Sequence, residues 1–274
     1  MPATINTNVN ALFAQNASTA NSRAMSTAMQ QLSTGSRINS AKDDAAGLGI
    51  SQNMTSQIRG LNQAVRNVND GISMMQTTEG ALVEVSNMLQ RMRELAVQSA
   101  NGTYSPTQRT YLQTEFDALS TQIGRIGTDT KWNDQATLAT TATYTYQAGT
   151  SNGTTITVTL SGMSQGDLGL TGVNASIGAS TTNAVSALTV IDAAIDKVNL
   201  NRAKIGSGIN QMSYAADNLS NISTNLSASR SSIQDTDYAS ASTQLSKAQI
   251  VQQAATAMLA QANQHSQSVL SLLK

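Results

Sequence analysis

Apolar side chains recur at alternating intervals of three and four residues through long stretches of the chain. One series comprises Met54, Ile58, Leu61, Val65, Val68, Ile72 and Met75, and another comprises Leu82, Val85, Leu89, Met92 and Ala96. This spacing puts the apolar positions on one narrow stripe of an α-helix. Pro2 and Pro106 are the only prolines, so no proline interrupts a helix between them. Asn101-Gly102 is expected to end the helix with a left-handed glycine.

A second helix is predicted directly after the first. Ser105 can cap its N-terminus, Pro106 suits the first helical position, and Gln108 completes a capping box. The apolar face of this helix comprises Tyr111, Leu112, Phe116, Leu119 and Ile123. Gly124 and Gly127 follow that face and are expected to end the helix. The two helices should then fold back on each other as an antiparallel pair.

The middle of the chain, about residues 128–180, is rich in Thr, Gly and Ser and has short alternating stretches. Segments 143–146 and 155–160 alternate in the way typical of half-buried strands, and the glycines at 149 and 153 supply a turn between them. Two short strands cannot bury a core alone. The pattern therefore predicts a hairpin that lies on the helices.

The spacing of threes and fours returns in the last third of the chain. The series is Leu188, Ile191, Ile195, Val198, Arg202, Ile205, Ile209, Met212, Ala216, Leu219, Ser223, Leu226, Arg230 and Ile233. Its three polar members, Arg202, Ser223 and Arg230, are expected to set the helix register. Asp235-Thr236-Asp237 breaks the series, and a last helix is predicted from about Tyr238.

These elements predict a mainly α fold: a long antiparallel helical coiled-coil rod formed by the N- and C-terminal segments, with a small β-hairpin insertion in the middle. Helices at the two ends of the chain must meet, because each offers a narrow apolar stripe and nothing else to bury it. We expect an inner terminal-helix domain formed by residues 1–39 and 238–274. A helical rod domain is expected over residues 40–237, with the hairpin at about 128–180.

The two outermost arms carry more apolar surface than one helix pair can bury. The candidate assembly residues are Ile5, Val9, Leu12, Phe13, Met29 and Leu32 in the first arm, and Leu245, Val251, Met258, Leu259, Val269 and Leu273 in the second. Two different patches on one subunit make a heterologous contact, which builds an open helical filament when the rotation does not close. The alternative is an ordinary intramolecular helical bundle, and the pattern alone leaves both interpretations open.

Composition excludes several classes of function. The chain has no Cys and a single His, His265, so disulfides, thiolate zinc sites, cysteine nucleophiles and His-cluster metal sites are excluded. Sixteen basic and sixteen acidic residues give a net charge of zero, which provides no electrostatic footprint for nucleic acid or an anionic membrane. No apolar run is long enough to span a bilayer. We therefore expect no catalytic residue, no metal ligand and no cofactor, and hence no enzyme.

Two further features have structural interpretations. Asp43 and Asp44 are adjacent, so on a helix they would point in different directions and could not share a proton. Ser40 followed by Asp43 is instead typical of a helix start. The N-terminus lacks a basic leader and an apolar stretch, so we expect no cleavable secretory signal. The chain then either stays inside the cell or leaves by a route that reads no such signal.

Several long segments resemble bacterial flagellins. Residues 32–47, with the sequence LSTGSRINSAKDDAAG, resemble the N-terminal signature of that family, and residues 90–102 resemble its long-helix signature. Residues 240–250, 259–264 and 268–274 are similar to the flagellin C-terminus. The resemblance spans roughly residues 1–135 and 185–274.

The resemblance implies a self-assembling structural subunit of the bacterial flagellar filament, which serves motility. It further implies unfolded export by the flagellar type III system, a secreted and extracellular location, and no outer variable domain. The implied partners are copies of the chain itself, the filament cap and hook-associated proteins, and an export chaperone on the C-terminal arm. Arg91, Leu95 and Glu115 match positions where related flagellins contact a flagellin-sensing Toll-like receptor, and we expect them to form one patch.

Other interpretations are weaker. A hook–filament junction protein shares the helical ends, but the extreme C-terminus and the 90–102 segment favour the filament subunit. A type III translocator would need an apolar insertion segment, and a coiled-coil adhesin would need a repetitive stalk.

Overall fold

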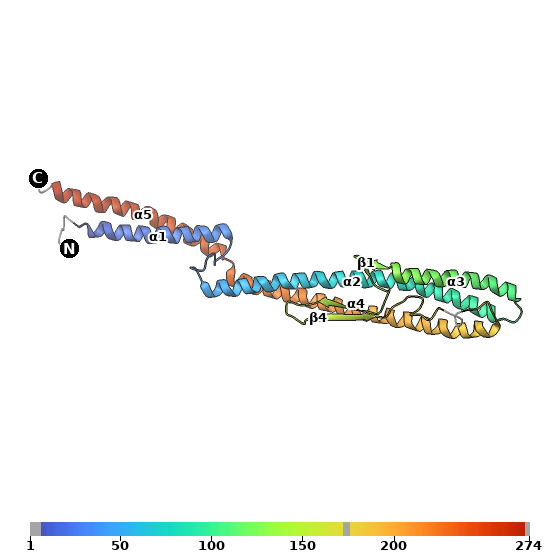
Figure 1. Ribbon diagram of the computed structural model, residues 1–274. Helices are drawn as coiled ribbons and strands as arrows, with labels where there is room; N and C mark the ends of the chain where they lie inside the picture. Colours follow the sequence, from blue (N-terminus) through green and yellow to red (C-terminus); the bar gives the residue numbers. More distant parts are fainter. Residues whose placement is uncertain (1–6, 172–175, 272–274) are drawn as a thin grey trace. The chain divides into compact units, whose positions relative to one another are not determined.

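The computed structural model describes residues 7–171 and 176–271, and within these ranges the chain is mainly helical (Figure 1). The elements are α1 (Val9–Thr34), α2 (Ala45–Ala100), α3 (Pro106–Asp129), β1 (Lys131–Trp132), β2 (Gln135–Ala136), β3 (Ala142–Gln147), β4 (Thr155–Leu160), α4 (Thr181–Gln234) and α5 (Tyr238–Ser271). The predicted fold class is confirmed, with small antiparallel strand pairs in the middle of a helical chain. The chain divides into two compact units, residues 1–58 with 224–274 and residues 59–223.

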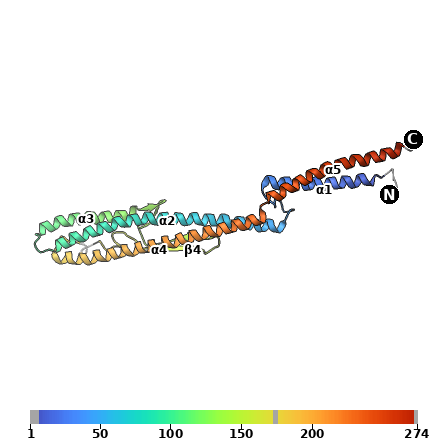
Figure 2. The ribbon, with the colours of Figure 1, turned by 180° about the vertical axis from the view of Figure 1, so that it is seen from behind.

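In the first unit, α1 and α5 lie side by side and run antiparallel (Figures 1 and 2). The helix is interrupted between α1 and α2, and the absence of proline from this region did not predict the interruption. Gly35 ends α1 in a left-handed conformation with φ 71°, and its N–H donates to the carbonyl of Gln31. The absence of proline is therefore not enough to keep a helix continuous.

The segment after α1 pairs with the segment between α4 and α5. The backbone N–H of Arg37 donates to the carbonyl of Gln234 (2.7 Å), and that of Thr236 donates to the carbonyl of Gly35 (3.0 Å). The Arg37 guanidinium also donates to the carbonyl of Ile233 (2.7 Å). We call residues 35–37 and 235–237 the joint. The predicted break at Asp235-Thr236-Asp237 is confirmed, because α4 ends at Gln234 and α5 begins at Tyr238.

Each of the two adjacent carboxylates binds backbone N–H groups, so the structural interpretation holds. Asp43 accepts from the hydroxyl and N–H of Ser40 (3.0 and 2.9 Å). These bonds, the hydroxyl first, lower the pKa of Asp43. Asp44 accepts from the N–H of Gly47 at 2.8 Å and so caps α2. The helix therefore starts after Asp44, not at Ser40 as predicted.

In the second unit, α2 and α4 pack antiparallel along the predicted stripes. Cross-helix contacts join Asn62 to Ser223 at 2.9 Å, Glu79 to Arg202 at 4.0 Å and Arg93 to Asp192 at 2.8 Å, so the partner number falls as the residue number rises. The buried core between them includes Val68, Met75, Leu82, Leu89 and Met92 from α2 and Ile191, Val198, Ile205 and Met212 from α4. Ser223 and Arg202 are two of the polar stripe positions, and both face the partner helix.

Helix α3 begins as predicted but ends later. Ser105 and Gln108 form the reciprocal capping box, with Pro106 at the start. The helix continues through Gly124 and Gly127 to Asp129, so these glycines are not its stop. A Cβ at position 127 would lie 2.8 Å from the carbonyl oxygen of Met163, which explains the glycine by close packing. The expectation of a left-handed Gly102 is also wrong, because its φ is not positive.

The predicted hairpin of β3 and β4 is confirmed, in antiparallel register from Ala142↔Leu160 to Gln147↔Thr155. Ile156, Val158 and Leu160 are buried, as the alternating pattern requires. The fully buried amide of Asn201 on α4 accepts from the N–H of Ser161 (3.1 Å) and donates to its carbonyl (2.8 Å). This pair of hydrogen bonds holds the end of the hairpin on α4.

The short hairpin of β1 and β2 was not predicted. Lys131 pairs with Ala136 and Trp132 with Gln135, and the two residues between them, Asn133 and Asp134, have φ of 47° and 63°. Asn and Asp tolerate this left-handed region and favour a two-residue hairpin turn. The Asn-Asp pair was the available signal.

The two glycines of α3 provide a matched test of this packing. We expect Gly127→Ala to lower the free energy of unfolding by roughly 1–3 kcal/mol, because the new methyl group meets a backbone carbonyl that cannot rotate away. Gly124→Ala should instead raise it by about 0.5–1 kcal/mol, since its Cβ makes only ordinary contact, 3.6 Å from Gln165, and alanine favours the helix. Urea unfolding followed by circular dichroism measures both. Equal effects of the two variants would contradict the packing role of Gly127.

Burial of a tyrosine on the hairpin generates a pH prediction. Burial raises the pKa of Tyr146 from 10.0 to about 12, with the charge of Tyr144 adding to the rise. The Tyr146 hydroxyl lies 3.2 Å from the Met74 sulfur. The folded state favours the neutral form of Tyr146, because the pKa is higher in the folded chain than in the unfolded chain. The contribution of Tyr146 to the stability of the fold is therefore complete below pH 10.0 and is lost as pH rises through about 12. Tyr146→Phe should therefore flatten the alkaline loss of stability in thermal melts. Tyr214→Phe, at a side chain 76% exposed, should leave it unchanged.

Candidate assembly interface

The seam between α1 and α5 is built mostly from small residues. The less exposed positions of the two helices recur at intervals of three and four. The positions with this spacing are Ala11, Ala14, Ser18, Asn21, Met25, Ala28 and Leu32 on α1, and Ala241, Leu245, Ala248, Gln252, Ala255, Leu259 and Ala262 on α5. Ser22 and Gln31 on α1 are also less exposed and lie beside them. Alanines let two backbones approach closely, and side chains of α1 reach backbone carbonyls of α5. Asn8 donates to Ala262 (3.0 Å) and Asn21 donates to Ala248 (2.7 Å).

A polar cluster lies within this seam. The Asn21 amide also donates to the side-chain oxygen of Gln252 (3.2 Å), whose own amide donates to the hydroxyl of Ser18 (3.1 Å). A polar group in an otherwise apolar seam is satisfied in only one alignment of the helices. The cluster therefore fixes the register of α1 against α5.

Several large apolar side chains of the pair lie outside the seam. They are between 40% (Val251) and 70% (Phe13) exposed, and they comprise Val9, Leu12, Phe13, Met29, Ile250, Val251 and Met258. Three of them border a groove of about 730 Å³ along one side of the pair. The groove is lined by Asn10, Phe13, Ala14 and Ala17 from α1 and by Val251, Ala254, Ala255, Met258, Gln261 and Ala262 from α5. We call this side the apolar face.

The other side of the pair is polar but almost uncharged. Gln15 and Thr19 on α1 and Gln249, Gln253 and Thr256 on α5 are exposed, and helical spacing places them across the seam from Phe13 and Met258. Within the bounds of the two helices, Arg23 and Lys247 are the only residues among Asp, Glu, Lys and Arg. The pair therefore has two chemically different sides: one apolar, and one rich in amides and hydroxyls that also carries exposed Leu12.

The structure separates the predicted assembly residues into three groups. The exposed group is Val9, Leu12, Phe13, Met29, Val251 and Met258, whereas Leu32, Leu245 and Leu259 are partly buried in the seam. Ile5 and Leu273 lie outside the described residues, as does the side chain of Val269. Sequence reasoning missed exposed Ile250 and the alanines of the groove. The spacing of alanines at threes and fours was the signal that identifies the seam.

The predicted receptor patch on α2 and α3 forms in part. The Arg91 guanidinium bonds the carboxylates of Glu115 on α3 and of Glu94 on its own helix, each at 2.9 Å. These bonds, that to Glu115 first, raise the pKa of Arg91. Leu95 is only 1% exposed and belongs to the core, so it does not share the surface of Arg91 and Glu115.

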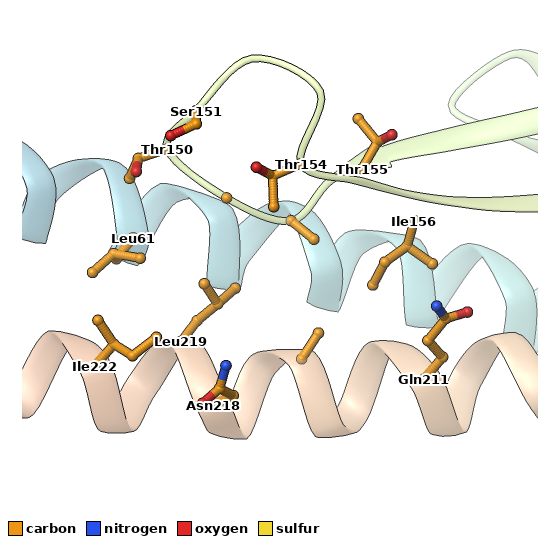
Figure 3. Close-up of a pocket in the computed structure, with 13 residues that line it drawn as sticks. Leu61, Thr150, Ser151, Thr154, Thr155, Ile156, Gln211, Asn218, Leu219 and Ile222 are labelled. Carbon is orange, nitrogen blue, oxygen red and sulfur yellow. The ribbon is translucent and has the colours of Figure 1, made fainter.

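The second unit has a cavity of about 430 Å³ under the turn between β3 and β4 (Figure 3). Thr150, Ser151 and Thr154 of the turn lie above it, and Gln211 and Asn218 come from α4. None of the lining side chains is acidic, basic or histidine, so this cavity holds no group for acid–base catalysis.

Two searches of the described residues concern other kinds of site. Residues 7–171 and 176–271 contain no cluster of three or more His, Cys, Asp or Glu side chains placed to bind a metal ion. In the same part of the chain, every helix is too short or too polar for a membrane span. The side chain of His265 lies outside the described residues.

Comparison with known families decides what this architecture belongs to. Residues 5–143 match the bacterial flagellin N-terminal helical region, and residues 188–273 match the bacterial flagellin C-terminal helical region. The chain belongs to the bacterial flagellin family. It is thus a structural subunit of the bacterial flagellar filament, in agreement with the function that the sequence predicts.

Individual relatives agree with this assignment. A flagellin of Halalkalibacterium halodurans is 44% identical over 252 residues, which cover 90% of this chain and 91% of the relative. Flagellin C of Vibrio cholerae is 34% identical over 377 aligned positions, which cover 100% of each chain. That alignment is longer than the 274 residues of this flagellin, so the relative contains residues with no counterpart here.

A solved structure assigned as a flagellar hook-associated protein of Vibrio parahaemolyticus is also similar. Its TM-score is 0.58 with 16% sequence identity, and the match covers 70% of this flagellin and 100% of that chain. At this identity the likeness shows the fold alone. The curated relatives are flagellins, so the hook–filament junction alternative is not favoured.

Proposed function

We propose that this flagellin polymerises through its terminal helix pair, with the apolar face of one subunit packed against a neighbouring copy. The observation that supports the proposal is the reversed use of side chains in the α1–α5 pair. Alanine is the commonest residue of the seam, while Phe13 and Met258 stay 70% and 65% exposed. Large exposed apolar patches mark interaction sites on soluble proteins. A second subunit would complete the burial that the single chain leaves unfinished.

The two different sides of the pair favour an open assembly. If the apolar face contacts a different surface of the next subunit, the contact is heterologous and repeats without limit. We assign this role to an inner domain of residues 1–39 and 238–274. Residues 40–237, with the hairpin region at 128–180, form the second domain. The shorter length relative to the Vibrio cholerae flagellin supports the absence of an outer variable domain.

The remaining partners belong to the same proposal. Unfolded export by the flagellar type III system to an extracellular filament is supported by the absence of Cys, which leaves no disulfide to hinder threading. The exposed side chains of α5 are the surface that an export chaperone would cover before assembly. The filament cap and hook-associated proteins would meet the same terminal helices. The proposal gives the chain no catalytic role.

Assembly should depend on the apolar face more than on other exposed apolar residues. We expect Phe13→Gln to raise the critical concentration for seeded polymerisation by about tenfold or more, because a large apolar side chain no longer becomes buried at the contact. Sedimentation of filaments, with electron microscopy of the pellet, measures this concentration.

Val185→Gln is the matched control. Val185 is 55% exposed but lies on α4 in the second unit and is not among the residues that line the groove. A chain without residues 238–274 should fail to polymerise at any concentration. Growth of filaments by that truncated chain, or equal effects at Phe13 and Val185, would overturn the proposed contact.

A second role is supported by the ion pair on α2 and α3. We propose that the unpolymerised subunit presents Arg91 and Glu115, held 2.9 Å apart, to the flagellin-sensing Toll-like receptor. Leu95 would act from the core, by supporting the helix under this surface, and not by direct contact.

Two arginines on α2 test this role: Arg91→Ala is the test variant and Arg93→Ala is its control. Arg91→Ala should reduce activation of reporter cells that express the receptor, because it removes the centre of the Glu94–Arg91–Glu115 cluster. Arg93→Ala removes an equally short ion pair, with Asp192 at 2.8 Å, and should have a smaller effect. Unchanged activation by the Arg91 variant would argue against the patch.

A further inference from the structure

In the part of the chain that the structure describes, the methionines with the most exposed side chains lie on the terminal helices, whereas Met25, Met54 and Met88 are only partly exposed. Of the 11 methionines in the sequence, Met74, Met75, Met92, Met163 and Met212 are buried in the second unit. The two that count as exposed are Met29 (51%) on α1 and Met258 (65%) on α5. Because the chain has no cysteine, thioethers are its readily oxidised sulfur groups.

Only one of these two methionines lines the groove. Met258 stands on the apolar face with Phe13 and Val251, whereas Met29 does not border the groove. We propose that Met258 is an oxidation site through which a peroxide-class oxidant controls whether a subunit can join the filament. This inference rests on the proposed function of the apolar face.

The chemistry needs no catalyst from the protein. A lone pair of the Met258 sulfur attacks one oxygen of hydrogen peroxide, the O–O bond breaks, and the sulfoxide and one water molecule result. The sulfur is oxidised by two electrons and the peroxide is reduced by two. The product is a polar, chiral side chain in place of a flexible apolar one. Among the residues that line the groove, only Asn10 and Gln261 carry side-chain hydrogen-bond donors, and the others have apolar side chains.

The sulfoxide therefore opposes the contact that the thioether favours. In the free subunit the new oxygen is solvated by water, but packing against a neighbour would remove that water. Burial of Met258 in the filament would in turn protect it from oxidant. The oxidation then acts on subunits before assembly, and methionine sulfoxide reductases can reverse it.

A competition within one sample tests the inference. The full-length Met29→Leu chain is partly oxidised with hydrogen peroxide as free subunits, seeded with filament fragments and separated into pellet and supernatant. Peptide mass spectrometry then gives the fraction of Met258 sulfoxide in each. We expect the sulfoxide to be enriched about tenfold or more in the supernatant. In the Met29→Leu/Met258→Leu chain, the same treatment should leave polymerisation unchanged, since leucine is apolar and cannot be oxidised.

Two results would overturn the assignment. One is an equal fraction of Met258 sulfoxide in pellet and supernatant. The other is a loss of polymerisation in the oxidised Met29→Leu/Met258→Leu chain as large as that in the oxidised Met29→Leu chain. Failure of the proposed function is recognised separately, because Phe13→Gln and Val185→Gln would then have equal effects on the polymerisation of untreated chains. Before any polymerisation, the order of oxidation gives an independent check. Met258 should react well before buried Met75 and Met212, which are 0% exposed. Equal rates would also contradict the inference.

Discussion

Burial of a narrow stripe between antiparallel helices is the interaction on which both units of this flagellin depend, but the two units complete it to different degrees. Between α2 and α4 the stripe holds large side chains such as Leu82 and Ile191, and the hairpin supplies further burial. Between α1 and α5 half of the named stripe positions are alanine, which buries little apolar area per residue. The first arrangement gives a finished core, whereas the second leaves several large side chains exposed.

Local and periodic signals predicted most of the helices and the main hairpin. The capping box at Ser105 and the break at Asp235 need only neighbouring residues, so they can be identified from a short window. Gly127 could not be interpreted in this way. It looked like a helix stop, but its role is set by the Met163 carbonyl, which is distant in sequence and reaches the helix only in the folded chain.

The candidate site was partly predictable for the same reason. Phe13 and Met258 could be identified from the sequence because they belong to the large apolar residues that exceed what one helix pair can bury. The division between seam and surface was harder, since Leu32 and Leu259 resemble Phe13 in hydrophobicity and differ only in the side of the helix that they occupy. The spacing of the alanines distinguishes the seam positions from the exposed positions, but the large apolar residues alone do not show it. Contacts between copies lie outside what one chain can display.

The joint links the two ends of the polypeptide through main-chain atoms. Because the N–H of Arg37 bonds the carbonyl of Gln234, and that of Thr236 bonds the carbonyl of Gly35, each strand of the joint satisfies groups of the other. These bonds use main-chain atoms, but Gly35 has a φ of 71°, a left-handed conformation that favours glycine, so substitution at this position of the joint is strained. The two segments cannot separate at this point without leaving backbone N–H and carbonyl groups without their hydrogen-bond partners. The joint therefore ties two segments of the backbone together, although about two hundred residues separate them in the sequence.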